Sequence, residues 1–321
     1  MSTIRLLSTC VALAVLSCGV AWAQQYPVKP VRVVIVFPPG GATDIVGRVV
    51  FQKMGEQLNQ QFVIDNRVGA SGTIGAAFVA KSPPDGYTIM VYSATLVANA
   101  HLYKKLPYDA LKDFIGITPV ARLVGVLVVH PSMPVRTIKD LIALAKARPD
   151  EISYGTAGVG AFQHLATSLF TNMAKVDMVH VPYKGGGPAA IATAAGEVQV
   201  MLTPISEVLP HVQSNRVRPI AVSSDKRTTQ LPQLPTIGET VKGYEFISWM
   251  GTFVPAGTPK PIVDRLSAEL KRAVADPSVA TNLSSQSLDP MYMLPEEFSR
   301  LLKSEYDKYE NVVKISGARV D

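Results

Sequence analysis

Cysteine is almost absent from this chain of 321 residues, which contains only Cys10 and Cys18. Both lie in an apolar run, residues 6–20, that follows a basic residue and precedes Ala21-Trp22-Ala23. This pattern predicts a secretory signal peptide, residues 1–23, with cleavage after its last residue. The exported chain would contain no cysteine, which excludes both a disulfide and a thiolate site.

Two other interpretations of this N-terminal segment stay open. The apolar run could be a buried helix, although it has no charge or cap and a strand pattern begins soon after it. Val15-Leu16-Ser17-Cys18 also resembles a lipoprotein processing site, in which Cys18 would be lipidated and become the first mature residue. The small-residue pattern that ends at Ala23 fits a cleavage site better.

A long basic tract is also missing. The formal net charge is +6, and residues 1–23 contribute only Arg5, so the exported chain would carry 6 − 1 = +5. The basic pairs are scattered and no aromatic stripe lies among them, which argues against a nucleic-acid partner. The modest positive charge would favour encounter with small anions. No later apolar run is long enough to span a bilayer.

Signatures of cofactor, metal and covalent chemistry are missing as well. Gly158-Val159-Gly160 lacks the third glycine of a dinucleotide fingerprint, and no P-loop occurs. Gly69-Ala70-Ser71-Gly72 has the wrong spacing for a nucleophile elbow and predicts a turn before a helix, Thr73 to Ala80. The histidines are too dispersed for a metal site (His101, His130, His164, His180 and His211). We therefore predict no cofactor, no metal and no catalytic residue.

The chain does contain short β-branched runs that alternate with helical patterns. The predicted strands are Val31–Phe37, Phe62–Asp65, Tyr87–Tyr92, Val124–Val129, Ile152–Tyr154, Met178–Val181, Val198–Leu202 and Val217–Val222. This order is typical of an α/β fold with mostly parallel sheets flanked by helices. Ligand sites in such sheets lie at the carboxyl ends of the strands. Helix caps are predicted at Thr137, within a capping box, and at Thr258.

The pattern changes after Tyr244. One last strand, Phe246 to Val254, precedes a helical tail from Pro259 to about Ile315. This strand and the strand Val124–Val129 lie where the alternation resets, so we predict that both cross between two lobes.

Two lobes are expected because a mature chain of this length exceeds what one hydrophobic core usually serves. The crossing strands would make lobe one discontinuous, with residues 24–123 and 252–321, and would leave residues 124–251 as lobe two. Two sequential domains, or one large sheet, stay open as alternatives.

Glycine-rich loops follow several of the predicted strands. The first strand leads into Pro38-Pro39-Gly40-Gly41 and then a helix that starts near Ala42-Thr43-Asp44. Glycine allows close approach of the backbone, and the exposed amides of a helix start favour an anion, so a carboxylate would fit there. Asp44 could instead be only a helix cap, and the glycines only a tight turn.

The same arrangement recurs three times. It recurs at Gly155-Thr156-Ala157-Gly158-Val159-Gly160 before a helix near Ala161, at Tyr183-Lys184-Gly185-Gly186, and in shorter form at Ser93-Ala94-Thr95. His164, one turn beyond Gly160, could reach the ligand or simply pack against a neighbouring element. Lys184 could meet the charge of the ligand or be solvated.

Taken together, these motifs resemble one family. They are Phe37-Pro-Pro-Gly-Gly-Ala-Thr-Asp44, Asn66-Arg67-Val-Gly69-Ala-Ser-Gly72-Thr-Ile-Gly75, Pro84-Asp85-Gly86-Tyr87, His164-Leu165-Ala166, Val181-Pro-Tyr-Lys-Gly-Gly-Gly-Pro188 and Leu234-Pro235-Thr236. In this order they are similar to the extracytoplasmic receptors of tripartite tricarboxylate transporters, also called Bug-type or TctC-type solute-binding proteins. The resemblance covers essentially the whole mature chain.

The resemblance implies a two-lobed type II periplasmic binding protein-like fold that closes over one small carboxylate: a dicarboxylate, a tricarboxylate, an acidic amino acid or an aromatic acid. It implies a periplasmic monomer without enzymatic activity, which delivers its ligand to membrane subunits of the transporter. The implied ligand-binding positions are Gly41, Ala42, Thr43, Asp44, Ser93, Ala94 and Thr95 in lobe one, and Thr156, Ala157, Gly158, Gly160, Ala161, Tyr183, Lys184, Gly185, Gly186 and Thr203 in lobe two.

Two positions depart from the family pattern. Ala161 and Gly186 stand where many relatives carry serine, so two hydroxyl donors are missing and the end of the site that sets selectivity is in doubt. A sensor that presents the closed lobes to a membrane kinase stays open as an alternative function. A periplasmic enzyme that uses the glycine loops to stabilise an oxyanion is a third, although no nucleophile and base pattern supports it.

Overall fold

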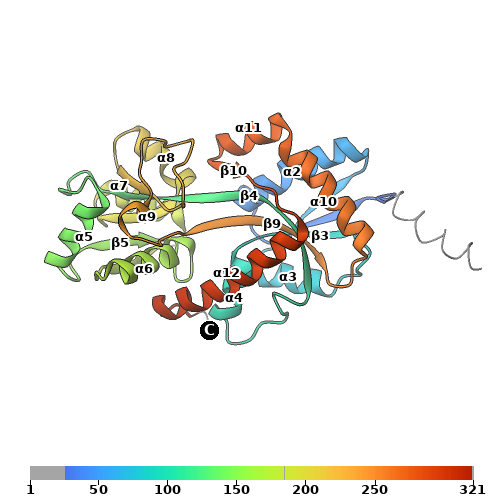
Figure 1. The fold of residues 1–321 in the computed structure, drawn as a ribbon, viewed down its shortest axis with the longest axis horizontal. Coiled ribbons are helices and arrows are strands. Elements are labelled where there is room, and N and C mark those ends of the chain that lie inside the picture. The colour runs from blue at the N-terminus through green and yellow to red at the C-terminus, as the bar shows by residue number, and fades with distance from the viewer. Residues whose placement is uncertain (1–25, 184, 320–321) are drawn as a thin grey trace, which may run out of the picture.

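The structure is a computed structural model that describes residues 26–183 and 185–319. The predicted signal peptide with Cys10 and Cys18 lies outside these residues, and so does Lys184. The described chain forms two lobes joined by long strands, with helices on the outside (Figure 1). The two-lobed α/β fold that the sequence predicts is confirmed.

The strands of the described residues form one curled sheet of ten, in the order β2-β1-β3-β9-β4-β7-β5-β6, with β8 and β10 also paired to β4. They are β1 (Val31–Ile35), β2 (Phe62–Asn66), β3 (Thr88–Ser93), β4 (Phe114–Val129), β5 (Ser153–Thr156), β6 (Val179–Pro182), β7 (Val200–Pro204), β8 (Arg218–Val222), β9 (Ile247–Pro255) and β10 (Leu288–Pro290). β1 pairs in parallel with β2 and β3, and β5 pairs in parallel with β6 and β7. Each lobe is therefore built on parallel strands, as predicted.

The helices cover both faces of the sheet because both faces of its strands are apolar. They are η1 (Ala70–Gly72), α2 (Ala42–Leu58), α3 (Thr73–Ala80), α4 (Thr95–Leu102), α5 (Ile138–Ala147), α6 (Phe162–Ala174), α7 (Gly186–Ala195), α8 (Ile205–Gln213), α9 (Ile237–Thr240), α10 (Lys260–Ala275), α11 (Pro277–Ser285) and α12 (Pro295–Ser316). In β1, Val33 and Ile35 join the core under α2, α10 and α11, whereas Val34 joins the core under α3, α4 and α12.

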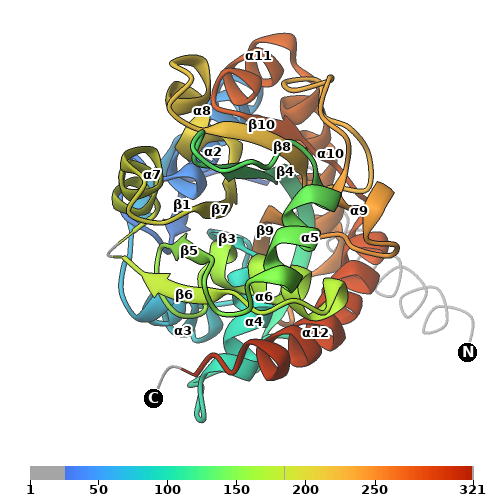
Figure 2. The same cartoon turned by 90° about the vertical axis from the view of Figure 1, so that its left-hand side faces the viewer.

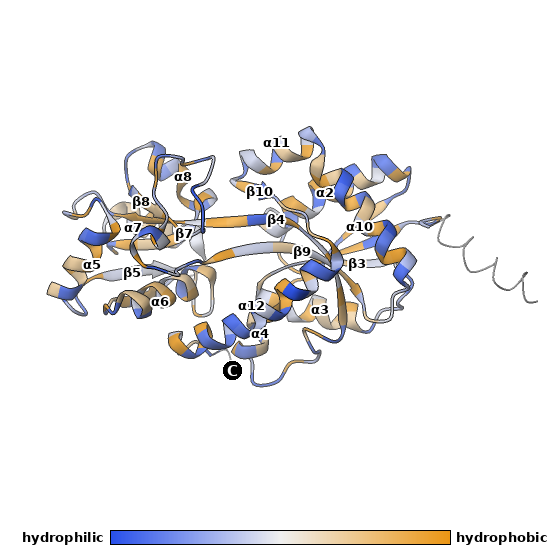
Figure 3. Cartoon of the chain, viewed as in Figure 1, coloured by the Kyte–Doolittle hydropathy of each residue, from blue (hydrophilic) through white to orange (hydrophobic). Residues whose placement is uncertain are grey.

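Lobe two repeats this layering. Val128 of β4 packs with residues of α7 and α8, whereas its neighbour Leu127 packs with residues of α5 and α6. Figure 2 shows these helices around the strands of lobe two. The cluster that contains Leu127 also contains Val34, so one core face continues through both lobes. The outer helices α10 and α12 alternate between hydrophilic and hydrophobic residues along their length (Figure 3), as expected for helices with one buried side.

β4 and β9 are the two crossing strands. The first half of β4 pairs with β9 and β10, and its second half pairs with β7 and β8. β4 begins ten residues earlier than the predicted strand at Val124, and its register with β9 shifts between Gly116 and Thr118 and between Pro119 and Ala121. Because glycine and proline occur at these irregularities, the pattern of apolar residues does not predict the first half of the strand. The predicted boundaries between the two lobes, after residue 123 and after residue 251, stay a prediction.

The predicted helical tail is mostly helical, but a short strand interrupts it. The segment contains three helices, α10, α11 and α12, and the short strand β10. Asp276 ends α10 and caps α11, because its side chain accepts a hydrogen bond from the Ser278 amide at 2.9 Å. A proline follows that cap, and another starts α12, so each break has a local cause.

One predicted helix cap is confirmed and the other is wrong. Thr137 forms the expected capping box with Asp140 at the start of α5. Thr258 does not cap α10: the N-cap is Pro259, and the Thr258 hydroxyl donates to the Pro255 carbonyl at 2.8 Å. The hydroxyl therefore closes the turn after β9 instead of binding a helix amide.

Two glycines on the crossing strands make room for the aromatic ring of Phe298 on α12. A Cβ atom on Gly251 of β9 would lie 2.5 Å from Cζ of Phe298, and one on Gly116 of β4 would lie 2.7 Å from Cδ1. Phe298 is fully buried and also packs against Trp249, with ring centroids 5.2 Å apart. This slot fixes the last helix across both crossing strands.

We expect Gly251→Ala to destabilise the protein by about 1–3 kcal/mol, because the added methyl group overpacks the Phe298 slot. Urea unfolding monitored by circular dichroism measures the loss. Gly187→Ala is the matched control, since a Cβ atom there meets no atom within 4 Å and the residue lies in the first turn of α7. Equal unfolding midpoints for Gly251→Ala and the wild type would contradict the slot.

Candidate functional site

The strand registers place the carboxyl ends of strands from both lobes near the same part of the crossing strands. β3 runs antiparallel to β9, and its last residue, Ser93, lies opposite Met250, which in turn lies opposite Ala121 of β4. β7 runs antiparallel to the other half of β4, and its last residue, Pro204, lies opposite Gly125. The carboxyl ends of the two half-sheets therefore face each other across four residues of β4, roughly 13 Å of strand.

Because β1 is parallel to β3, and β5 and β6 are parallel to β7, their carboxyl ends point to the same junction. The loops after β1, β3, β5, β6 and β7 each lead into a helix, α2, α4, α6, α7 and α8. We call this meeting place of five helix starts the interlobe site. Every residue that the sequence predicts for ligand binding, apart from Lys184, lies in one of these loops, at a strand end or in the first turn of the helix that follows.

Asp44 holds the first loop in place. Its Oδ2 accepts hydrogen bonds from the Gly40 amide and from Nε of Arg48, both at 2.9 Å, and its Oδ1 accepts one from Asn66 at 2.8 Å. Asn66 also donates to the Phe37 carbonyl at 3.0 Å. Asp44 lies in the first turn of α2 and is buried, whereas the N-cap is Gly41, so the alternative that Asp44 caps the helix does not hold.

The charge of Asp44 is compensated within the loop. Burial alone would raise the pKa of its carboxyl, but hydrogen bonds from Arg48, Asn66 and Gly40 and the charge of Arg48 lower the pKa below its ordinary value. Both carboxylate oxygens already accept hydrogen bonds. The side chain is thus a positioning group for the loop, and the groups that α2 can offer a ligand are main-chain amides.

The start of α2 offers such amides. The first amides of a helix have no acceptor within the helix. Within the described part of the chain, the amides of Ala42, Thr43 and Asp44 have no protein acceptor, whereas the Gly41 amide donates weakly to the Pro38 carbonyl at 3.4 Å. Three adjacent N–H groups at the positive end of a helix of 17 residues form a suitable site for a carboxylate.

The loop after β3 contributes hydroxyl groups. The Ser93 hydroxyl, at the end of β3, donates to the hydroxyl of Thr95, the first residue of α4, at 2.9 Å. The Ala94 amide donates to the Trp249 carbonyl of β9 at 3.0 Å, so it is already used. Of the three predicted residues in this loop, Ser93 and Thr95 present polar groups and Ala94 provides the backbone anchor.

A buried network behind this loop was not predicted from the sequence. Asn99 of α4 is fully buried and donates to the Tyr92 hydroxyl at 2.9 Å and to the Ser71 carbonyl at 3.1 Å. Tyr92 donates to the same carbonyl at 2.5 Å. These bonds tie η1 to the end of β3. A lone polar residue in an apolar helix is the signal that could have indicated Asn99.

In lobe two, Thr156 organises the loop after β5. Its side-chain oxygen accepts a hydrogen bond from the Gly158 amide at 3.2 Å and lies 2.6 Å from Nε2 of His180. The Ala161 amide donates to the Gly158 carbonyl at 3.3 Å, and Ala161 then caps α6 in an extended conformation. Gly158 and Gly160 have φ of +129° and +76°, so the loop requires glycine at both positions.

The loop after β6 is tied to the loop after β5. The Tyr183 amide donates to the Thr156 carbonyl at 2.9 Å, and the Gly185 amide donates to the Ala157 carbonyl at 3.2 Å. The amide of Gly185 is therefore already used, and the first free amides of α7 belong to Gly186 and Gly187 within the described residues. The loops after β5 and β6 act as one unit.

His164 supports the loop before α6. Its Nδ1 accepts a hydrogen bond from the Gly160 amide at 3.2 Å, and its ring stacks on His180 with centroids 4.1 Å apart. Burial lowers the pKa of His164 from 6.5 to about 4, with a smaller effect from the charge of His180. Both rings also border a hollow of about 770 Å³ between α6 and the end of α12. His164 is therefore packed and positions Gly160.

Thr203 belongs to a cluster that includes two residues that the sequence analysis missed, Gln163 and Glu207. Gln163 donates to the Thr203 hydroxyl oxygen at 3.1 Å and to Oε2 of Glu207 at 2.7 Å, and the Thr203 hydroxyl donates to the same Oε2. The three residues come from the starts of α6 and α8 and the end of β7. Because Gln163 and Thr203 are 40 residues apart in the sequence, no local sequence pattern predicts their contact.

The loops of the two lobes touch. A Cβ atom on Gly160 would lie 3.2 Å from both terminal methyl carbons of Leu102, the last residue of α4. Gly160 belongs to the lobe-two loop, and α4 starts at the lobe-one loop after β3. The lobe-two loop before α6 and the end of α4 in lobe one are therefore in contact.

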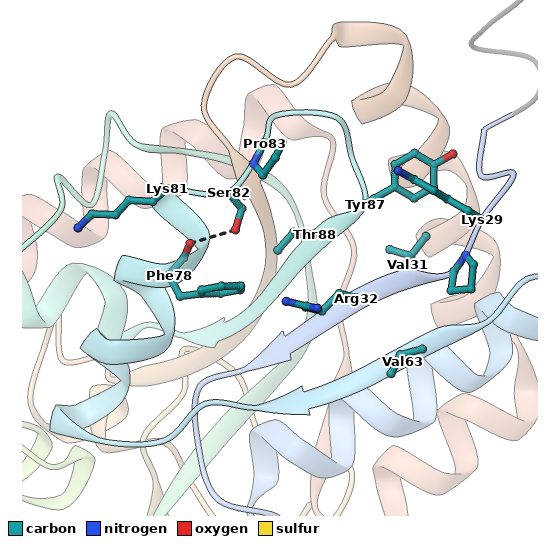
Figure 4. A pocket seen from close by; sticks show the side chains of 11 residues that line it. Lys29, Val31, Arg32, Val63, Phe78, Lys81, Ser82, Pro83, Tyr87 and Thr88 are labelled. Atoms are coloured by element: carbon teal, nitrogen blue, oxygen red, sulfur yellow. Dashed lines mark hydrogen bonds between the residues drawn. The ribbon is translucent and has the colours of Figure 1, made fainter.

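A second hollow lies at the opposite edge of lobe one. About 640 Å³ in volume, it is bordered by Lys29, Arg32, Phe78 and Tyr87 at the amino ends of β1 and β3 (Figure 4). Lys29 lies 4.0 Å from Asp85, and the guanidinium of Arg32 stands over the Phe78 ring. This hollow is at the wrong end of the strands to involve any predicted site residue.

Neither a metal-ligand cluster nor a membrane-spanning helix occurs among the described residues. No group of three or more histidine, cysteine, aspartate or glutamate side chains among them could hold a metal ion. None of the helices in residues 26–183 and 185–319 is sufficiently long and apolar to cross a bilayer.

Comparison with known proteins gives concordant matches. Residues 46–317 match the family model described as tripartite tricarboxylate transporter family receptor. Protein BugT of Bordetella pertussis is 32% identical over 328 residues, which cover 100% of both chains. The solved structure of R. palustris Rpa4515 with adipate is 36% identical with a TM-score of 0.80, and the alignment covers 92% of this chain and 100% of that one. MatC from Rhodopseudomonas palustris with bound malate is 30% identical with a TM-score of 0.73 and coverages of 90% and 100%.

His164 predicts an acid sensitivity. Because its folded-state pKa is about 4 and its ordinary value is 6.5, the unfolded chain binds the proton first, and stability should fall as pH falls from 6.5 to about 4. His164→Asn places an oxygen near the Nδ1 position without a titrating group, so part of this loss should disappear. Burial also lowers the pKa of His180, so His180 adds to the pH dependence in the same direction.

Urea unfolding at a series of pH values across this window measures the effect. His211→Asn on α8 is the control, because the His211 side chain forms no hydrogen bond within the described chain. The same pH dependence in the wild type and His164→Asn would show that His164 does not carry the effect.

Proposed function

Because this chain belongs to the tripartite tricarboxylate transporter receptor family, we propose that it binds a small carboxylate at the interlobe site and delivers it to the membrane subunits of such a transporter. The family consists of receptors that bind solutes. The adipate complex of Rpa4515 and the malate complex of MatC support a small carboxylic acid as the ligand class. The predicted signal peptide supports a periplasmic location.

The observation that carries this proposal is the set of unpaired amides at the junction. Ala42, Thr43 and Asp44 present theirs at the start of α2, and Gly186 and Gly187 present theirs at the start of α7, within the described residues. The α2 amides can donate several hydrogen bonds to a carboxylate, and the positive end of the helix stabilises its charge, whereas the α7 amides can donate to an oxygen atom at the other end of the ligand. Neither lobe alone supplies both sets.

Binding would proceed in two steps. The carboxylate first docks on the amides of α2, whose loop is held by the Asp44 network. Lobe two then closes by bending of β4 and β9 between Ala121 and Gly125, and the contact between the Gly160 loop and Leu102 in the structure would belong to this closed state. Closure follows because the ligand gains contacts to lobe two only in the closed state.

A proline substitution tests the role of the α2 amides. Ala42 is the first residue of α2, and Gly41 before it is extended with φ −78° and ψ 164°, so both positions suit Ala42→Pro. The substitution removes one N–H group that the helix does not need. A lost hydrogen bond to a charged group is worth about 1.5–3 kcal/mol, so we expect affinity to fall roughly tenfold to a hundredfold.

The measurement starts with a thermal-shift panel of mono-, di- and tricarboxylates and acidic amino acids. At a hundredfold excess over Kd, a true ligand adds about 2.7 kcal/mol of stability. Calorimetric titration of the best ligand then compares the wild type, Ala42→Pro and the control Ala42→Ser, which keeps the amide. The proposal fails if no carboxylate shifts the transition, and the role of α2 fails if Ala42→Pro binds as tightly as Ala42→Ser.

A further inference from the structure

Glu207 places a negative charge at the lobe-two end of the interlobe site. It is the third residue of α8, directly after β7, whose carboxyl end faces lobe one. Its Oε2 accepts hydrogen bonds from Gln163, at 2.7 Å, and from the Thr203 hydroxyl. The carboxylate is therefore fixed in position and not a free surface group.

Gly186 gives this carboxylate its space. A Cβ atom on Gly186 would lie 2.1 Å from Oε2, 2.3 Å from Cδ and 2.4 Å from Oε1 of Glu207. The backbone of Gly186 is not in the left-handed region, so conformation does not require glycine at this position. The carboxylate lies directly against the main chain at the start of α7, and any larger residue at position 186 would displace it.

Three helix starts surround the group. Gln163 is the second residue of α6, Gly186 is the first of α7, and Glu207 lies in the first turn of α8. The positive ends of these helices stabilise a carboxylate between them. Burial raises the pKa of Glu207, and the hydrogen bonds from Thr203 and Gln163 oppose that rise.

One oxygen of the group has no hydrogen-bond donor among the described residues. The hydrogen bonds that the described residues make to Glu207 all go to Oε2. Oε1 has none from this part of the chain, and the side chain is only half-buried. An acceptor oxygen in this position would bind a donor group on a ligand and repel an anionic one.

We propose that Glu207 determines which group a ligand can carry at the end opposite its docked carboxylate: a hydrogen-bond donor such as a hydroxyl or ammonium group is favoured, and a second carboxylate is disfavoured. This inference rests on the proposed carboxylate binding. Because position 186 is glycine, a charged acceptor lies where the hydroxyl of a serine at that position would be a neutral donor.

Calorimetric titrations with ligands of matched length test the proposal. The probes are succinate, 4-hydroxybutyrate and 4-aminobutyrate, and then adipate, 6-hydroxyhexanoate and 6-aminohexanoate, at mildly alkaline pH. The wild type should bind the hydroxyl- or ammonium-ended member of a series about tenfold or more tightly than its dicarboxylate. Glu207→Gln, which offers an amide donor of the same shape, should reduce or reverse that ratio by about tenfold or more.

Gly186→Ser is a second, independent variant, because its Cβ atom must displace the Glu207 carboxylate. It should move the ratio in the same direction, and it serves as the test if Glu207→Gln does not fold. Glu151→Gln, an exposed residue of lobe two, is the control and should leave the ratio unchanged.

The two proposals fail in different ways. If the wild type binds none of the six probes and none of the carboxylates of the wider panel, the proposed function is wrong. If the wild type binds carboxylates but Glu207→Gln and Gly186→Ser change the ratio by less than about twofold, carboxylate binding stands and the role of Glu207 is wrong.

Discussion

The antiparallel pairing of β4 with β9 in one lobe and with β7 in the other is the constraint on which the site depends. This pairing fixes the directions of β3 and β7, and the strands that pair in parallel with them run in the same directions. As a result, β1, β3, β5, β6 and β7 end at one junction, and the helix that follows each of them starts there. The interlobe site is thus a consequence of strand register more than of any single side chain.

Most of the side chains at this junction hold loops in place. Asp44 accepts the amide of Gly40, Thr156 accepts that of Gly158, and His164 accepts that of Gly160. Each of these bonds fixes a glycine-containing turn whose neighbouring amides stay free for a ligand. A site made of main-chain amides can bind any carboxylate, so selectivity must come from the few side chains that face the ligand. Glu207 is the one whose charge is most directly placed for that purpose.

Much of the fold could be predicted from the sequence, because short apolar runs that end in glycine define parallel strands well. The loops of the site were predicted for the same reason. The first half of β4 was not, because Gly116 and Pro119 interrupt its pattern. The tail after Pro259 was predicted to be helical, but not where Asp276 and two prolines divide it into separate helices. The cluster of Gln163 and Glu207 is formed by tertiary contacts that no local pattern encodes. Gly186, which the family resemblance marks as a position without the expected hydroxyl group, makes room for the Glu207 carboxylate, and this contact is visible only in the structure.

The central claim is that free amides at helix starts from both lobes hold the ligand. Amide hydrogen exchange, measured with and without a saturating carboxylate, tests it most directly. The account predicts added protection in two separate segments, residues 41–45 at the start of α2 and residues 185–188 at the start of α7, together with slower exchange along β4 near Ala121 to Gly125. Protection confined to one lobe, or centred on the hollow near Lys29 and Arg32, would contradict it.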